Sequence, residues 1–196
     1  MRALALGLVQ WHTAHPDWTP DARPGTPEYW PREVGCVAVR GDSVTAFIDP
    51  LAPAGRDEWE ALDGLVADRE RVVVTTASWH GRDGELFAQR YNARLLRHDE
   101  PWPDVVTPLP VREALETMVW IAAHRTLVPG DVLVGDDAGG LRVCDQSWLQ
   151  STPVAAVQAR LREVIPRPVE KVLVSHWAPV TSGADAALEA ALTPGS

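Results

Sequence analysis

The chain has 196 residues, of which 45% are hydrophobic and 23% charged, so it is long enough to bury a core without disulfides or a structural metal. Its formal net charge of −9, with no cluster of basic residues, argues against nucleic acid or an anionic membrane as a partner. No apolar run approaches the roughly 18 residues of a membrane-spanning helix, and the apolar opening is too short for a signal peptide.

The first half of the chain predicts antiparallel strands followed by helices. An opening strand leads into residues 11–33, where proline, tryptophan and acidic residues follow no period, which predicts a long structured loop. Strands at 35–40 and 43–49 should form a hairpin around Gly41-Asp42. The spacing of apolar residues then predicts a helix over 56–68, a strand over 71–75, a helix over 82–91 ending at Asn92, and a strand over 93–97.

The second half alternates strands with helices. In order, we expect a proline-rich loop over 98–113, paired strands over 117–122 and 125–128, a further strand over 131–135 extending the same sheet, a helix over 152–164, a strand over 171–175 and a helix over 184–192. Thr152 should cap the first of these helices, with Pro153 at its first position. Without internal repeats or a linker, the chain is expected to form a single domain over 1–196, in which helices cover mixed sheets: an α/β (α+β) sandwich.

Apolar strands of this chain end on side chains that can bind a metal or move a proton. Asp131 interrupts the run from Leu127 to Val134, and His176 follows the run from Lys171 to Ser175. The strand at 71–75 should open into the same site and is followed by His80. Polar groups at the ends of buried strands are a common way to build a site in layered α/β proteins.

The order of these motifs resembles the metallo-β-lactamase superfamily. The order is Phe47-Ile-Asp49-Pro, Val72-Val-Val-Thr-Thr76, a helix, Trp120-Ile followed by His124-Arg-Thr-Leu-Val-Pro-Gly-Asp131, and Val172-Leu-Val-Ser-His176, so that residues 34–192 are covered. The resemblance implies an αββα sandwich with a metal site along one edge. It also implies that Asp131 and His176 stand at two ligand positions of that site.

The remaining ligands that the resemblance implies are mostly replaced. Thr76, Ser78, His80 and Gly81 stand where the family has a His-x-His-x-Asp-His run; shifting the register by two puts Ser78, His80, Arg82 and Asp83 there instead. Arg112 falls near the position of a further histidine, and a guanidinium has no lone pair to give to a metal.

The number of available ligands therefore decides which kind of metal site can be expected. A catalytic zinc needs about three protein ligands and an open position, and His80, Asp131 and His176 are the candidates. We expect no dinuclear centre and no resident cofactor unless a single, weakly held zinc binds. The two cysteines, Cys36 and Cys144, are expected to be buried free thiols, which fits a reducing cytoplasm.

Two hypotheses of function follow. The favoured one is a non-catalytic relative, a pseudoenzyme with a degenerate metal site, that binds a small anionic or aromatic molecule beside Arg112 and the loop aromatics. The alternative is a hydrolase that uses one metal-activated water held by His80, Asp131 and His176, with His15 as a further group from the loop. A third, weaker hypothesis is an assembly role, such as a homodimer, through exposed tryptophans.

Each candidate also has a purely structural interpretation. His80 could be a surface or helix-start histidine, Asp131 a turn former, and His176 a residue that bonds a carbonyl. Asp49 is expected to bond the backbone at the end of its sheet, and Asp136 to line the pocket or to sit in a solvated turn. A Ser175-His176-Asp131 triad is rejected because adjacent residues of a strand point to opposite faces.

Overall fold

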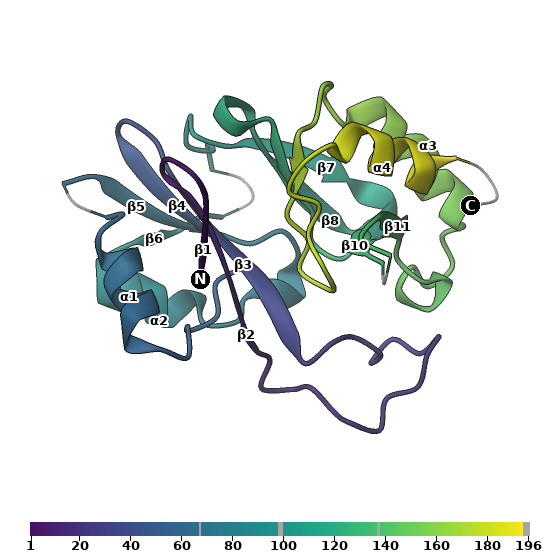
Figure 1. The fold of residues 1–196 in the computed structure, drawn as a ribbon, viewed down its shortest axis with the longest axis horizontal. Helices are drawn as coiled ribbons and strands as arrows, with labels where there is room; N and C mark the ends of the chain where they lie inside the picture. The colour runs from purple at the N-terminus through teal and green to yellow at the C-terminus, as the bar shows by residue number, and fades with distance from the viewer. Residues whose placement is uncertain (67, 98–99, 137, 194–196) are drawn as a thin grey trace.

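A computed structural model describes residues 1–66, 68–97, 100–136 and 138–193. Two β-sheets lie face to face in the middle of the molecule, with helices on both outer sides (Figure 1). The six-stranded sheet has the order β1-β2-β3-β4-β5-β6, and the four-stranded sheet has the order β12-β9-β8-β7. The predicted mixed α/β class and αββα layering are therefore confirmed.

The larger sheet changes from antiparallel to parallel pairing along its width. Its strands are β1 (Arg2–Ala5), β2 (Leu8–Ala14), β3 (Glu33–Arg40), β4 (Val44–Ile48), β5 (Glu70–Val74) and β6 (Arg94–Leu95). Strands β1 to β4 are antiparallel, whereas β4, β5 and β6 are parallel and are connected through α1 (Arg56–Asp63) and α2 (Gly84–Tyr91). The prediction of a loop over 11–33 was wrong at both ends: residues 11–14 continue β2, and Glu33 already belongs to β3 and pairs with Ala14.

The smaller sheet differs from the prediction in two ways: it includes β7, which was not predicted, and it does not include the strand expected over 131–135. It consists of β7 (Thr107–Val111), β8 (Glu116–Ile121), β9 (Thr126–Val128) and β12 (Lys171–Val172), of which β12 runs parallel to β9. Strand β7 falls in the expected loop at 98–113, of which residues 98–99 lie outside the described residues. Its two prolines are tolerated because β7 is an edge strand. The expected strand at 131–135 is instead β10 (Leu133–Gly135), which pairs with β11 (Leu141–Val143) in a hairpin separate from the sheet.

Apart from the first, the helices end where the sequence predicts. Asn92 terminates α2 in a left-handed conformation, as expected. Helix α1 stops at Asp63, earlier than predicted, and residue 67 of the predicted span lies outside the described residues. Pro153 is the N-cap residue of α3 (Val154–Val164) rather than its first residue, so the expected cap at Thr152 was wrong. Helix α4 (Ala184–Leu192) closes the fold. In the described parts of the chain, no helix combines the length and the apolar character needed to cross a membrane.

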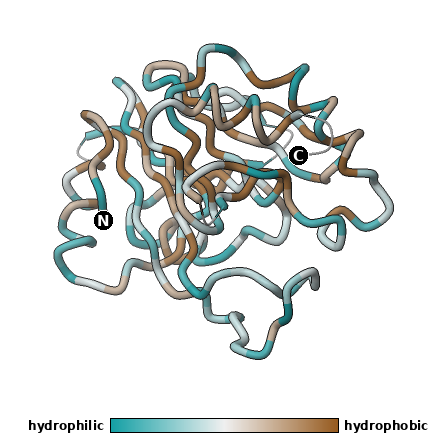
Figure 2. Tube along the Cα trace, turned by 45° about the vertical axis from the view of Figure 1, so that its right-hand side comes forward, coloured by the Kyte–Doolittle hydropathy of each residue, from teal (hydrophilic) through white to brown (hydrophobic). Residues whose placement is uncertain are grey.

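The core follows the alternation of side chains along the strands. On β5, Val72 and Val74 face the second sheet, whereas Val73 faces the helices and packs with Leu62 and Phe87. Brown, apolar segments accordingly concentrate in the central strands (Figure 2). Burial of each large apolar side chain stabilises the fold by about 1.5–3 kcal/mol. The second sheet buries its other face against α3 and α4.

The two sheets meet at one edge, and this meeting creates the site. The Gly35 N–H of β3 donates to the Ser175 carbonyl, 2.7 Å away, just beyond β12. A Cβ at Gly35 would lie 2.5 Å from the Val174 carbonyl oxygen, so the close approach requires glycine. The carboxyl ends of β4, β5, β9 and β12 lie at this edge and lead to Asp49, His80, Asp131 and His176.

Candidate metal-binding site

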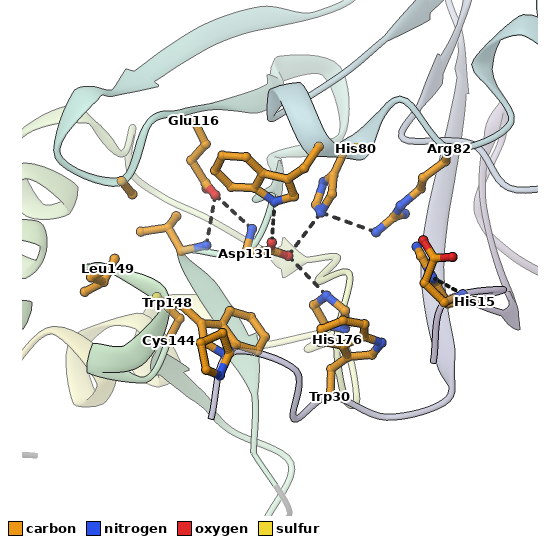
Figure 3. A pocket seen from close by; sticks show the side chains of 15 residues that line it. His15, Trp30, His80, Arg82, Glu116, Asp131, Cys144, Trp148, Leu149 and His176 are labelled. Atoms are coloured by element: carbon orange, nitrogen blue, oxygen red, sulfur yellow. Dashed lines mark hydrogen bonds and ion pairs between the residues drawn. The ribbon is translucent and has the colours of Figure 1, made fainter. Parts of the chain in front are cut away.

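A pocket of about 320 Å³ lies at the edge where the sheets meet (Figure 3). Its polar lining residues are His15, Asp17, His80, Arg82, Glu116, Asp131, Cys144 and His176. Its apolar lining residues are Pro27, Trp30, Trp79, Ala114, Val132, Trp148 and Leu149. Side chains from the N-terminal loop and from both sheets therefore surround one space.

Asp49 holds the His80 ring from behind. His80 lies on the short 3-10 helix η1 (Ser78–His80) after β5, and its Nδ1 is 3.0 Å from Asp49 Oδ2. Asp49 also accepts the Thr76 hydroxyl at 2.5 Å and the Thr76 backbone N–H at 2.8 Å. Because Nδ1 donates its proton to Asp49, the neutral ring turns an unprotonated Nε2 toward the pocket.

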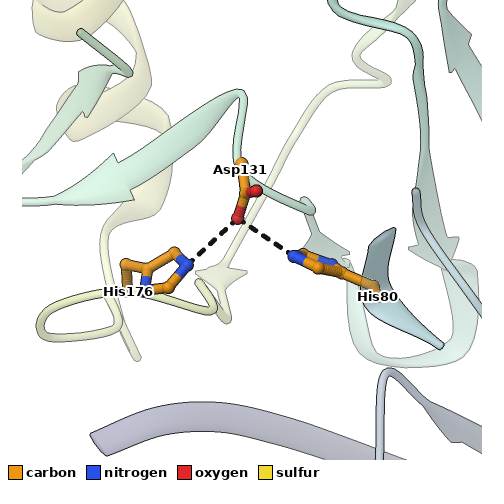
Figure 4. Close-up of side chains that lie close together, drawn as sticks. All are labelled: His80, Asp131 and His176. Carbon is orange, nitrogen blue, oxygen red and sulfur yellow. Dashed lines mark ion pairs between the residues drawn. The ribbon is translucent and has the colours of Figure 1, made fainter. Parts of the chain in front are cut away.

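Asp131 lies between the two imidazole rings (Figure 4). Its Oδ1 is 3.2 Å from His80 Nε2 and 3.1 Å from His176 Nε2. Among the described residues, however, this buried oxygen has no hydrogen-bond partner, and neither has His176 Nδ1. The contacts are thus close in distance without the geometry of a hydrogen bond. The other oxygen, Oδ2, accepts the Trp79 indole N–H at 2.8 Å.

Three electron-rich atoms facing one another require a positive charge between them. In the protein without a metal, a proton can supply it: burial alone lowers the pKa of His80, but the charges of Asp131 and Asp49 outweigh burial and raise it to about 10. Burial lowers the pKa of His176 despite Asp131 beside it. Burial would raise the pKa of Asp131, yet the two histidines hold it well below its usual range.

The same three atoms also fit a metal ion. His80, Asp131 and His176 each offer one ligand atom, and these atoms lie within 4.8 Å of one another. Zinc takes nitrogen and oxygen ligands at about 2.0–2.2 Å, which places tetrahedral neighbours about 3.3 Å apart. The two distances to Asp131 Oδ1 match this spacing. Two histidines and one carboxylate, with an opening toward the pocket, form a donor set known from catalytic zinc sites.

Glu116 positions the backbone that carries Asp131. This buried residue at the start of β8 accepts the Asp131 N–H at 2.9 Å and the Val132 N–H at 3.1 Å through Oε2, and the Gly130 N–H at 3.3 Å through Oε1. Burial and the nearby Asp131 charge raise the pKa of Glu116 to about 8. A Cβ at Gly130 would lie 2.7 Å from Thr76 Oγ1 and 2.9 Å from Glu116 Oε2, so glycine is needed for this contact.

Arg82 links the two sheets beside the site. Its Nη1 donates to the Asp49 carbonyl at 2.9 Å, and its Nη2 donates to Ser175 Oγ at 2.5 Å. The guanidinium therefore binds groups that follow β4 and β12. Its Nη2 also lies 3.5 Å from His80 Nε2, which places a fixed positive charge at the rim of the donor group.

Aromatic side chains from separate segments wall the pocket. Trp30 comes from the N-terminal loop and lies 6.0 Å from the His176 ring, and Trp148 lies 5.4 Å from the same ring on the other side (ring centroids). The Trp148 indole N–H donates to the Thr26 carbonyl at 3.4 Å, which ties the loop to the second half of the chain.

The predicted site residues lie in different places. His80, Asp131 and His176 come together as predicted, and His15 lines the same pocket from the loop. Asp49 is behind His80 and bonds side chains as well as backbone. Arg112 does not enter this pocket but lines a neighbouring depression, and Asp136 closes the β10–β11 turn by accepting the Ala138 and Gly140 N–H groups.

Two residues of the site were not identified from the sequence. A lone glutamate before the apolar run 117–121 was the only signal for Glu116, because its role depends on backbone N–H groups 14 to 16 residues away. Trp79 lies between two positions of the family's ligand run, but its sequence position does not reveal that its indole reaches Asp131. Exposed tryptophans do not form an assembly surface: of the nine, all of which the structure describes, Trp79 alone is exposed.

Comparison with known proteins finds similar solved structures but no match by sequence. No family model matches the chain, and no curated protein matches it. A metallo-β-lactamase from Hirschia baltica has 11% identity and a TM-score of 0.59, covering 97% of this chain and 94% of its own.

Two further solved structures agree. One from Erythrobacter litoralis, also a metallo-β-lactamase, has 14% identity and a TM-score of 0.58 over 97% of this chain and 89% of its own. A metallo-β-lactamase family protein from Thermus thermophilus has 13% identity and a TM-score of 0.52 over 96% of this chain and 79% of its own. At this identity, similarity of structure speaks for the fold and leaves the activity open. The chain has the metallo-β-lactamase fold.

Proposed function

We propose that the protein holds one divalent metal ion, zinc by preference, through His80 Nε2, Asp131 Oδ1 and His176 Nε2, and hydrolyses a small substrate admitted to the pocket. The observation that carries this proposal is Asp131 Oδ1, a buried carboxylate oxygen without a hydrogen bond that faces two imidazole nitrogens. A zinc ion held there would act as a Lewis acid and lower the pKa of a water molecule toward neutrality.

The chain supplies the support that a metal ligand needs. Asp49 fixes the His80 tautomer and ring orientation, which is the usual task of a carboxylate behind a ligating histidine. Glu116 fixes the backbone of Asp131. These supports favour the single-metal hydrolase over the incomplete site expected from ligand number, because the three remaining donors converge and Arg112 lies elsewhere.

His15 is the group best placed to exchange a proton with a substrate. It lines the pocket from the N-terminal loop, and its Nδ1 accepts the Asp17 N–H at 3.2 Å. That bond leaves Nε2 as the protonated nitrogen of the neutral ring, available to donate to a bound substrate. Burial lowers the pKa of His15, so the ring is neutral at physiological pH.

A non-catalytic protein that binds a small molecule is the second candidate. A protonated His80 lies close enough to Asp49 and Asp131 to balance the charge of both carboxylates, which would let the network persist without a metal. In that case the tryptophan-lined pocket would bind an apolar or aromatic molecule. We propose no nucleic-acid or membrane partner for either candidate.

Metal analysis separates the candidates. The protein is purified without chelators, loaded with zinc, dialysed and analysed by mass spectrometry. We expect about one zinc per chain for the wild type and for His124→Ala, a control histidine outside the pocket, and below about 0.1 for His176→Ala and Asp131→Asn. A wild type without zinc after loading would leave only the non-catalytic candidate.

Activity is measured separately on p-nitrophenyl acetate and a chromogenic β-lactam. Zinc-loaded wild type should turn over at least one of the two, and Asp131→Asn should lose about 100-fold or more of its kcat/KM. Stoichiometric zinc without turnover of either probe would contradict hydrolysis of these bond types while leaving the metal site intact.

A further inference from the structure

We propose that Trp79 serves this site in two ways: its indole N–H presents Asp131 through a single oxygen, and its ring is the platform on which an aromatic substrate stacks. The first role rests on the proposed function, because it concerns a metal ligand. The second role can be tested without a metal.

The hydrogen bond explains why Asp131 turns one oxygen inward. The Trp79 Nε1–H donates to Oδ2 at 2.8 Å, so this oxygen is engaged on the solvent side of the carboxylate. Oδ1 is left to face both imidazoles. Without the indole, the carboxylate could rotate and lose its alignment with the two rings. Donors that bond to a metal ligand in this way change metal affinity by about 10- to 100-fold.

Trp79 can perform this task because of its place in the chain. It precedes His80 on η1, and its ring lies 6.3 Å from the His80 ring at 76°. Asp49 and Thr76 anchor that short helix through His80. The proposed ligand His80, which Figure 3 shows beside Asp131, and the donor Trp79 are therefore held by the same short helix.

The exposure of the ring points to a second role. Trp79 is 52% exposed, although an indole of this size is normally buried. A depression of about 230 Å³ lies beside the main pocket, and Trp79, Trp148, Ala114 and Leu149 line both hollows. The exposed Leu115 adds a further apolar wall to the outer one.

This arrangement selects the chemical class of the substrate. Trp79 and Trp148 line both the outer depression and the pocket that holds the donor atoms. Flat aromatic groups stack on indole faces. A substrate with an aromatic ring next to its hydrolysable bond can lie on Trp79 with that bond near Asp131.

Cobalt affinity tests the first role. Trp79→Phe removes the N–H and keeps an aromatic ring; we expect the Kd for Co²⁺, read from its visible absorption, to rise about tenfold with a changed band shape. Trp18→Phe is the matched control, because Trp18 does not line the pocket and its indole N–H donates to the Trp30 carbonyl at 3.0 Å and not to a ligand; its Kd should stay within about twofold. Circular dichroism checks that both variants are folded.

Binding of p-nitrophenol to the metal-free protein tests the second role. We expect Trp79→Ala to weaken binding about fivefold or more and Trp79→Phe to weaken it less than about threefold, with cyclohexanol binding more weakly than p-nitrophenol to the wild type. Unchanged binding in Trp79→Ala would overturn the platform.

The outcomes separate this inference from the proposed function. A wild type that binds no Co²⁺ overturns the proposed function together with the positioning role. A wild type and Trp79→Phe that bind Co²⁺ equally well, with the same spectrum, overturn the positioning role alone.

Discussion

Two networks of charged side chains in this protein differ in one decisive respect. The first network joins α1 and α2. Arg90 donates to both oxygens of Asp63, and the Tyr91 hydroxyl donates to the same carboxylate at 2.8 Å. The Arg90 guanidinium also lies 4.5 Å from the centre of the Trp59 ring. The Arg90 and Asp63 side chains are both about two-fifths exposed, so water and salt can replace their interactions.

The network at the sheet edge is buried and incomplete. Asp49 and His80 are each about one-twentieth exposed, and Asp131 Oδ1 and His176 Nδ1 lack hydrogen bonds among the described residues. Buried polar atoms without partners lower stability, so a fold retains them where something else uses them. Unmet acceptors, rather than the number of charges, therefore distinguish the candidate functional network from the exposed one.

The same substitution in the two networks gives the largest contrast. Asp49→Asn removes the anionic partner of His80, and asparagine tolerates the left-handed backbone at this position (φ 47°). We expect it to lower the free energy of unfolding of the metal-free protein by about 3 kcal/mol, because it removes one of the two carboxylates beside the buried His80 ring and puts an amide N–H where Oδ2 faces His80 and Thr76. Urea unfolding measures the effect. A loss as small as that of Asp63→Asn would remove the distinction between the networks.

Glycine substitutions in neighbouring loops test how tightly the buried network is packed. Gly130→Ala forces a Cβ against Thr76 Oγ1 and Glu116 Oε2, and we expect a loss of about 2 kcal/mol in thermal or urea unfolding. Gly81→Ala is the control: it follows η1 with helical backbone angles, and its Cβ would meet no described atom within 4 Å. It should be neutral or slightly stabilising.

Metal affinity should depend on pH because a proton competes for His80. With its pKa raised to about 10, metal-free His80 is protonated at pH 7, and a metal must displace that proton. The apparent Kd for zinc should therefore fall about tenfold per pH unit between pH 7 and about 9, with close to one proton released in calorimetry across buffers. A zinc affinity that does not change over this range would contradict a protonated His80 in the metal-free protein.

Asp63→Asn should have the smallest effect. Arg90 and Tyr91 lower the pKa of Asp63 against the opposing influence of burial, so its contribution is present above the ordinary carboxyl pKa and is lost as the pH falls through the folded value. Because the pair is exposed, we expect a decrease in Tm of no more than about 3 °C at pH 7 and a smaller decrease at about pH 3, below the ordinary carboxyl pKa. Differential scanning calorimetry at the two pH values measures it.

The fold could largely be predicted because its signals are local. Alternating apolar residues identified β3, β4 and β5, and Asn92 marked the end of α2. Strand β7 was missed because its prolines resemble a loop, and the end of β2 was missed because His12 and Ala14 interrupt the apolar pattern on its exposed face.

The site could be predicted in part. His80, Asp131 and His176 follow strands, and strand ends converge at one edge of a sheet. Arg112 and Glu116 could not be distinguished by position, because the turn of η2 (Arg112–Ala114) directs the first away from the pocket and leaves the second inside it. Side-chain direction after a short turn depends on tertiary packing, which a single sequence does not record.

The three donor residues come from two different sheets, and this affects how the sheets would be held together. His80 follows a strand of the larger sheet, whereas Asp131 and His176 follow strands of the smaller one. An ion shared by them would fasten the two halves of the sandwich together at the edge where Gly35 brings them closest. The melting temperature would then rise with the concentration of free metal, so the stability of the fold would depend on how much metal its surroundings supply.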